Sequence, residues 1–222
     1  MGTFIELTAA DGHRFAAYEA KPACAPKGAI VVAPEIFGIN AHIRSVADGY
    51  AADGYLAIAP ALFDRAQRDY DTGYSQPEIQ AGIAVMQKVD IADAMKDVDA
   101  AVAHARVAGK VAIVGYCWGG TVAWVAAARV PGLACSIPYY GGGIPQYAAE
   151  QPKVPVMFQF GEQDQSPKPE QARAVVAAHP GVLAHFYPAG HGFNCDQRGS
   201  YHAESAMLAR ERALAFLATH VG

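Results

Sequence analysis

The sequence predicts an α/β protein in which a mostly parallel sheet is flanked by helices on both faces. Short runs rich in Val, Ile and aromatic residues alternate along the chain with longer Ala-rich runs, an order typical of strands connected by helices. Some short runs, such as Ala29–Ala33, are apolar throughout, as expected of strands buried on both faces. The 222 residues are 52% hydrophobic, so we expect one domain, residues 1–222, with one sizeable core.

The elements follow from local patterns. Phe4–Thr8 and Arg14–Glu19 are expected to form an antiparallel pair across the turn signal Asp11-Gly12. The further expected strands are Ala29–Ala33, Tyr55–Ala59, Lys110–Val114, Leu133–Pro138, Val154–Phe160 and Leu183–Tyr187. The expected helices, recognised by apolar residues at three- and four-residue spacing, are Ala41–Ala52, Glu78–Lys88, Ile91–Val107, Gly119–Ala128, Glu170–Ala178 and Ala203–Thr219. The polar stretch Asp64–Pro77 is expected to be a surface loop.

Composition argues against several classes of function. The formal net charge is −4 and no run of Lys or Arg occurs, so neither nucleic acid nor an anionic membrane is an expected partner. The longest apolar runs are too short to cross a membrane, and the N-terminus lacks a secretory signal pattern. We therefore expect a cytoplasmic protein, acting as a monomer or weak homo-oligomer. The four cysteines are widely spaced without a C-x-x-C pair and are expected to be free thiols.

A nucleophile motif lies between the strand Lys110–Val114 and the helix that follows it. The run Gly115–Gly120 reads GYCWGG, which matches the sharp strand-to-helix turn of the α/β-hydrolase fold with Cys117 in place of serine. The flanking glycines leave room for a strained turn, and the helix N-terminus favours a thiolate. The alternative is that Cys117 is a small buried residue in a tight turn.

A carboxylate and a histidine follow later strands in the chain order that this fold requires. Glu162 and Asp164 both follow the strand ending at Phe160, and His191 lies between two glycines after the strand ending at Tyr187. Loops at the carboxyl ends of parallel strands are where such sheets place their sites. A histidine there can take a thiol proton, while a carboxylate fixes its orientation.

The other histidines show no grouping typical of a metal site. No H-x-x-x-H or H-E-x-x-H pattern occurs among the eight histidines, so we expect no metal and no cofactor. His202 is close enough to His191 in sequence to be a further candidate for lining the site. The remaining histidines are interpreted as surface or packing residues.

Across essentially its whole length the sequence resembles the dienelactone hydrolase (carboxymethylenebutenolidase) family. The most specific similarities are in the runs Pro34–Asn40, Gly115–Gly120, Gly161–Asp164 and Gly190–Phe193. The resemblance implies a triad of Cys117, Asp164 and His191 that hydrolyses small lactones or activated esters through a thioester. It also implies that the amides of Ile36 and Trp118 form an oxyanion hole.

The resemblance further implies that Glu35 takes the proton of Cys117 when substrate binds and then moves away. Residues beside these motifs are expected to contact substrate: Phe37, Tyr116, Phe193 and Arg198. The familiar dienelactone hydrolases hold the substrate carboxylate with two arginines, and the matching positions here are Cys195 and a residue near Ile79 or Gln80. Arg65, Arg68 or Arg198 are the possible substitutes. Two alternatives therefore stay open: an esterase or thioesterase for other small acyl substrates, and a non-catalytic relative that binds a small ligand.

Overall fold

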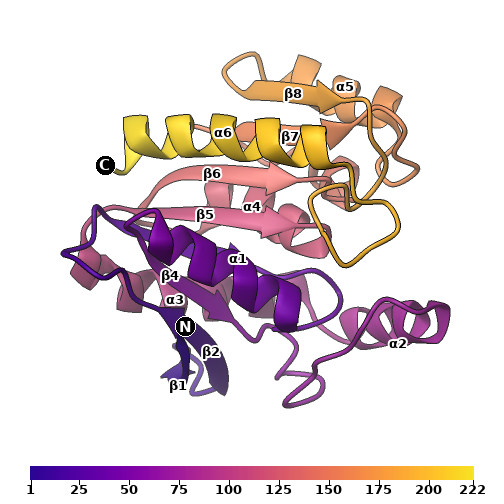
Figure 1. The fold of residues 1–222 in the computed structure, drawn as a ribbon. Helices are drawn as coiled ribbons and strands as arrows, with labels where there is room; N and C mark the ends of the chain where they lie inside the picture. Colours follow the sequence, from indigo (N-terminus) through magenta and orange to yellow (C-terminus); the bar gives the residue numbers. More distant parts are fainter.

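The computed structural model describes residues 1–222 and consists of one eight-stranded sheet between two layers of helices (Figure 1). The strands are β1 (Thr3–Thr8), β2 (Arg14–Ala20), β3 (Ala29–Ala33), β4 (Leu56–Pro60), β5 (Val111–Tyr116), β6 (Leu133–Tyr139), β7 (Met157–Gly161) and β8 (Leu183–Tyr187). The helices are α1 (Ala41–Ala52), α2 (Gln76–Met86), α3 (Ile91–Ala105), α4 (Trp118–Arg129), α5 (Pro169–Ala178) and α6 (Ala203–His220).

The strand order is β1-β2-β4-β3-β5-β6-β7-β8. β2 pairs antiparallel with β1 and β4, and every other neighbouring pair is parallel. The strand order reverses between β3 and β5, and the carboxyl ends of the strands beside such a reversal are where open α/β sheets bind ligands. The predicted fold class, with a mostly parallel sheet covered on both faces, is confirmed.

The central strand β3 explains why this sheet needs helices on both sides. Ala29, Val31 and Ala33 belong to the core cluster under α3, α4 and α5. Ile30 and Val32 belong to the cluster under α1 and α6, which lie in front of the sheet in Figure 1. Because successive side chains of a strand point to opposite faces, a strand that is apolar throughout is stable only between two apolar layers.

All the predicted strands and helices are present, with ends within about three residues of those expected. The clearest difference is at α2, which begins at Gln76, inside the stretch expected to be a loop. The amide of Ser75 donates to the Glu78 carboxylate at 2.8 Å, and Pro77 lies in the first turn, where its missing N–H costs nothing. A short 3₁₀ helix at Ile144–Tyr147 was not predicted. None of the helices is both long enough and apolar enough to span a bilayer.

Candidate active site

Cys117 lies in the turn between β5 and α4 with an unusual backbone conformation. Its φ is 55° and its ψ is −118°, a region that residues with a side chain rarely adopt. Its amide donates to the carbonyl of Tyr139 on β6 at 3.1 Å, which fixes the turn against the neighbouring strand. The strand-to-helix turn that the GYCWGG run predicts is therefore present in the structure.

The glycines of this turn are required by close backbone approach. A Cβ atom on Gly115 would collide with the carbonyl of Gly119 across the turn, and one on Gly119 would collide with the carbonyl of Ala33 at the end of β3. Backbone atoms cannot yield as a flexible side chain can. The two glycines therefore let the start of α4 pack directly against β3 and β5, which brings Cys117 next to the residues that follow β3.

His191 connects Cys117 to Asp164. Its Nε2 lies 3.1 Å from the Cys117 sulfur, and its Nδ1 lies 3.0 and 3.2 Å from the two carboxylate oxygens of Asp164. Asp164 is buried, with 1% of its surface exposed, and it also accepts a hydrogen bond from the amide of Ser166. The other carboxylate after β7, Glu162, is exposed and pairs with Arg173. Of the two, only Asp164 faces the histidine.

The surroundings of His191 favour its cationic form. Burial alone would lower the pKa of this imidazole, but the adjacent Cys117 sulfur and the Asp164 carboxylate together raise the pKa to about 10. An opposite charge within hydrogen-bond distance stabilises the charged state of a titratable group more than partial burial destabilises it. At neutral pH the histidine is therefore protonated and can donate from both ring nitrogens.

Glu35 lies two residues after the end of β3 and is fully buried. Its Oε1 accepts from Nη1 of Arg198 at 3.1 Å, and its Oε2 lies 3.4 Å from the hydroxyl of Tyr74. Arg198 lies over the rings of Phe37 and Tyr74 at 5.6 and 5.9 Å. A buried charge is tolerated when it is paired in this way. No hydrogen bond joins Glu35 to Cys117, whose sulfur instead faces His191.

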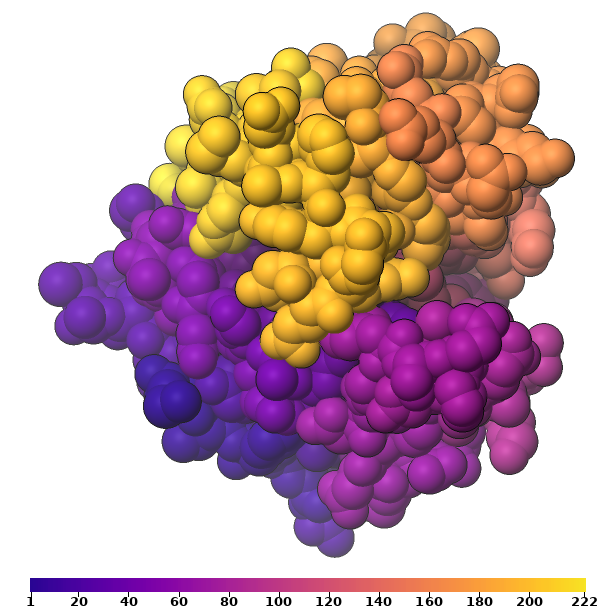
Figure 2. Space-filling view, turned by 45° about the vertical axis from the view of Figure 1, so that its right-hand side comes forward, coloured from indigo at the N-terminus to yellow at the C-terminus, as the bar shows by residue number.

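A cavity of about 660 Å³ adjoins Cys117 and His191. Figure 2 shows the hollow between the α2 segment and the loop that carries His191 and Arg198. One wall is apolar and comes from α2 and the segment after it: Ile79, Ile83, Met86, Val89 and Ile91. Arg198 is the only Lys or Arg in the lining, and its guanidinium has Glu35 as its only acceptor within the protein.

The other proposed substitutes for the missing arginines lie elsewhere. Arg65 forms ion pairs with Asp11 and Asp97, and Arg68 donates to the carbonyl of Arg14 at the surface. Neither side chain lines the cavity. Arg198 is thus the substitute that the structure brings to the site.

Some of the expected oxyanion donors and substrate contacts line the cavity, and others do not. Ile36 and Trp118 line the cavity. The amide of Ile36 donates no hydrogen bond within the chain, and Trp118 is the first residue of α4, where an amide has no acceptor in its own helix. Phe37 also lines the cavity.

Tyr116 and Phe193 do not reach the cavity. Both are fully buried in the cluster under α1 and α6, where Tyr116 packs on Tyr139 with ring centroids 4.7 Å apart. Their positions do not support the expected substrate contact: Tyr116 points to the strand face covered by α1 and α6, and Phe193 packs against Tyr140 and Tyr187 in the same cluster. His202 is the N-cap of α6 and accepts from the amide of Ser205, so it does not line the cavity either.

Two features of the site were missed at the level of sequence: the contact of Tyr74 with Glu35 and the apolar wall of the cavity. Tyr74 lies in the expected surface loop, yet its ring packs on Phe37 and its hydroxyl faces Glu35. The apolar wall could have been found, because Ile79, Ile83 and Met86 recur at three- and four-residue spacing in a short helix. Nothing in the local sequence around Tyr74 signals its contact with Glu35.

Comparison with known proteins agrees with this geometry. The model of the dienelactone hydrolase family matches residues 15–221. The chain is 34% identical to the carboxymethylenebutenolidase of Pseudomonas putida and 33% identical to carboxymethylenebutenolidase 1 of Cupriavidus pinatubonensis, in both cases over 96% of this chain and 95% of the relative.

Solved structures give the same result. A structure from Klebsiella pneumoniae that is assigned to the dienelactone hydrolases is 30% identical, with a TM-score of 0.84 over 97% of this chain and 99% of the other. A dienelactone hydrolase-like promiscuous phosphotriesterase from metagenomic libraries has the same fold, with a TM-score of 0.80 at 22% identity over 100% of this chain and 99% of the other. The length of the family match and the identity to its curated relatives show that the chain belongs to the dienelactone hydrolase family.

Proposed function

We propose that the chain is a carboxylic ester hydrolase that opens small lactones or cleaves activated esters through a cysteine thioester. The observation that carries the proposal is the continuous contact from Asp164 through His191 to the Cys117 sulfur, which borders a cavity large enough for a small substrate. Such an arrangement supplies a nucleophile, a proton carrier and an orienting acid in one place. Family membership supports the same class of reaction.

In the first half-reaction the Cys117 sulfur attacks the substrate carbonyl carbon. The carbonyl π electrons move to oxygen, and the amides of Ile36 and Trp118 donate to the resulting oxyanion. The intermediate collapses, the bond to the ring or ester oxygen breaks, and cationic His191 gives that oxygen its Nε2 proton. The products are a Cys117 thioester and an alcohol or enol. Asp164 keeps Nδ1–H of the ring oriented throughout.

In the second half-reaction the now neutral His191 takes a proton from water as that water attacks the thioester carbonyl. The same two amides stabilise the second oxyanion. When this intermediate collapses, the carbon–sulfur bond breaks, the carboxylic acid leaves and gives its proton to bulk water, and Cys117 and His191 return to their starting charges. The attacking water supplies both the proton that His191 takes up and the proton that the acid releases to solvent, so the proton balance closes with His191 and water.

The lining of the cavity favours a substrate with an apolar, uncharged body. Ile79, Ile83 and Met86 offer no partner to a charged group, and burying an unpaired carboxylate against them is costly. Arg198 can hold one polar or anionic substituent at the opposite side, because most of its donors have no acceptor in the protein. This favours simple esters and lactones over substrates that need two arginines, and it supports the wider esterase or thioesterase function as a second candidate.

The deciding experiment is a hydrolysis screen of wild type and Cys117→Ala. The panel pairs lactones and aryl esters of equal size with and without a carboxylate substituent. We expect turnover of the uncharged members, weaker turnover of carboxylated ones, and none by Cys117→Ala. Ligand binding without turnover, equal in both proteins, would identify a binding protein and remove the proposal.

We also propose a cytoplasmic location. The four cysteines are unpaired, and Cys117 has to remain reduced to act as a nucleophile, which fits a reducing compartment. Cell fractionation with a tagged chain tests this, and recovery in an oxidising compartment would contradict it.

A further inference from the structure

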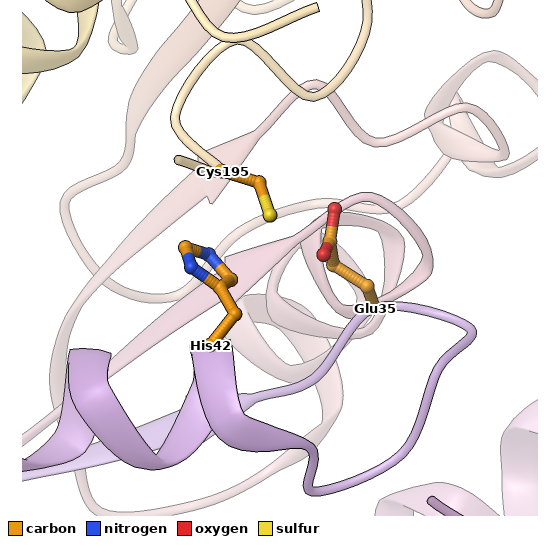
Figure 3. A group of neighbouring side chains, drawn as sticks. All are labelled: Glu35, His42 and Cys195. Atoms are coloured by element: carbon orange, nitrogen blue, oxygen red, sulfur yellow. The ribbon is translucent and has the colours of Figure 1, made fainter. Parts of the chain in front are cut away.

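Three potential metal ligands meet beside the cavity, from separate parts of the chain. Glu35 follows β3, His42 lies in the first turn of α1, and Cys195 lies in the loop after His191. One ligand atom from each lies within 4.8 Å of the other two, and all three side chains are buried. In the view of Figure 3 the Cys195 sulfur lies between the imidazole and the carboxylate.

The histidine of this group has an unexplained nitrogen. Nδ1 of His42 lies 3.2 Å from Oδ1 of Asp196, and Nε2 is buried with no hydrogen-bond partner. The side chain of His42 is only 4% exposed. A carboxylate that accepts from Nδ1–H fixes the tautomer whose Nε2 carries a lone pair. Metal-binding histidines are oriented by such an outer carboxylate, and a buried nitrogen without a partner calls for one.

We propose that Glu35, His42 and Cys195 bind a thiophilic divalent cation of the Zn²⁺ class. Thiolate, imidazole and carboxylate are the three ligand types that zinc uses in proteins, and the thiolate selects against hard cations such as Mg²⁺. A tetrahedral ion with bonds of about 2.0–2.3 Å holds its ligand atoms about 3.5 Å apart, so the group has to contract by roughly 1 Å.

The charges of the proposed ligands also fit a divalent cation. When the ion binds, the Cys195 thiol loses its proton, so the thiolate and the Glu35 carboxylate together balance the two positive charges of the ion. Arg198 is the existing cationic partner of Glu35 and competes with the ion for the same carboxylate. Ion binding and the pairing of Glu35 with Arg198 are therefore linked, which makes the ion able to reposition the only arginine of the cavity.

The test is Co²⁺ and Zn²⁺ titration of full-length Cys117→Ala, a background that removes the one other cysteine–histidine pair of the cavity. We expect one Co²⁺ per chain, with a sulfur-to-cobalt charge-transfer band that Zn²⁺ displaces. The charge-transfer band is measured with all three proposed ligands intact and requires no catalytic activity. The result is therefore independent of whether the proposed hydrolysis is correct. The absence of a sulfur-derived band, or of saturable binding, would overturn the site.

Variants in the same background assign the ligands. Cys195→Ser and His42→Asn should each weaken binding by more than the roughly tenfold to hundredfold loss expected for the outer residue in Asp196→Asn. The matched controls Cys24→Ser and His104→Gln, whose side chains are partly exposed and outside the group, should bind as the parent does. Arg198→Ala should bind more tightly, because the competing cation is gone. Unchanged affinity in Cys195→Ser, with the fold verified by circular dichroism, would refute the proposal.

Discussion

The two walls of the cavity are built in different ways. The polar wall carries Cys117, His191 and Arg198, which lie on turns and loops at the carboxyl ends of the sheet. The apolar wall comes from α2, which lies apart from the two helical layers in Figure 1. The polar wall is fixed by backbone contacts with several strands, whereas α2 is held mainly by apolar side-chain packing, with one close backbone approach of Gly82 to the Ile36 carbonyl. We therefore expect substitutions in the polar wall to change the reaction itself, and substitutions in the apolar wall to change substrate selection.

If the polar wall determines the reaction, Asp164→Asn should have the largest effect. Its carboxylate is the only partner that orients His191 from the Nδ1 side, and an amide there favours the wrong tautomer. We expect kcat to fall by about 10³–10⁴ on every substrate. The matched control is Glu162→Gln, which removes only a surface ion pair and should leave kcat within about twofold. The reverse ranking would show that the wrong carboxylate had been assigned.

Glu35→Gln tests whether the ion pair between Glu35 and Arg198 takes part in turnover. The substitution leaves Arg198 without its carboxylate. It also removes the group that the family resemblance implies as proton acceptor, a step that would precede the cycle proposed above by forming the Cys117 thiolate. We expect kcat to fall about ten- to hundredfold, and the free thiol to react with iodoacetamide no more slowly than in wild type.

Arg198→Met is the companion variant. An equal loss of kcat would assign the effect to the ion pair, whereas a loss confined to Glu35→Gln would assign it to proton transfer. Unchanged kcat in Glu35→Gln would leave Glu35 as a structural carboxylate only.

The pH profile should depend on the polar wall alone. Because His191 is protonated below its pKa of about 10, it can protonate the leaving oxygen there and loses this ability above it. We expect kcat/KM to fall about tenfold per pH unit above 10, equally for small and bulky esters. Removing the sulfur in Cys117→Ala should lower the histidine pKa, which NMR titration can follow. A wild-type profile that instead rises through pH 6–7 would mean that the resting histidine is neutral.

Substitutions in the apolar wall should instead change KM and leave kcat unchanged. Ile83→Ala opens space without touching the polar wall, so we expect KM for aryl esters to rise about five- to tenfold, from the loss of about 1 kcal/mol of apolar contact. kcat should be unchanged, and a small acetate ester should be unaffected. Ile91→Ala, at the end of the same wall, is a companion test. An equal effect on all substrates would show that α2 supports the reacting groups rather than selecting substrate.

The predictable part of the site is the part encoded locally. The GYCWGG turn and the residues following β7 and β8 each lie within a few positions of a recognisable strand, so order along the chain was enough to predict that Cys117, His191 and a carboxylate after β7 meet. The choice of Asp164 over Glu162 came from the family resemblance. The pairing of Glu35 with Arg198 spans 163 positions and has no local pattern. The same limit applies to the group of Glu35, His42 and Cys195, because a search for histidines at helical spacing cannot find ligands from three segments.

The errors at Tyr116 and Phe193 have a different cause. Their closeness in sequence to site residues suggested contact with substrate, but the side chain of Tyr116 points to the opposite strand face, and Phe193 packs into the same core cluster from the loop after β8. The strand pattern alone could have assigned Tyr116 to the face covered by α1 and α6, as the structure has it.

The long reach of Arg198 back to Glu35 has a consequence for synthesis on the ribosome. β3 and β5, with Glu35 and Cys117, are made well before the segment that contains His191 and Arg198, so the nascent chain holds a carboxylate without its cation and a thiol without its base. Both partners arrive with the segment that also leads into α6, which covers the front of the sheet (Figure 1). Translation that stops before this segment therefore releases a chain with an unpaired acid in its core, a product suited to degradation rather than to partial activity.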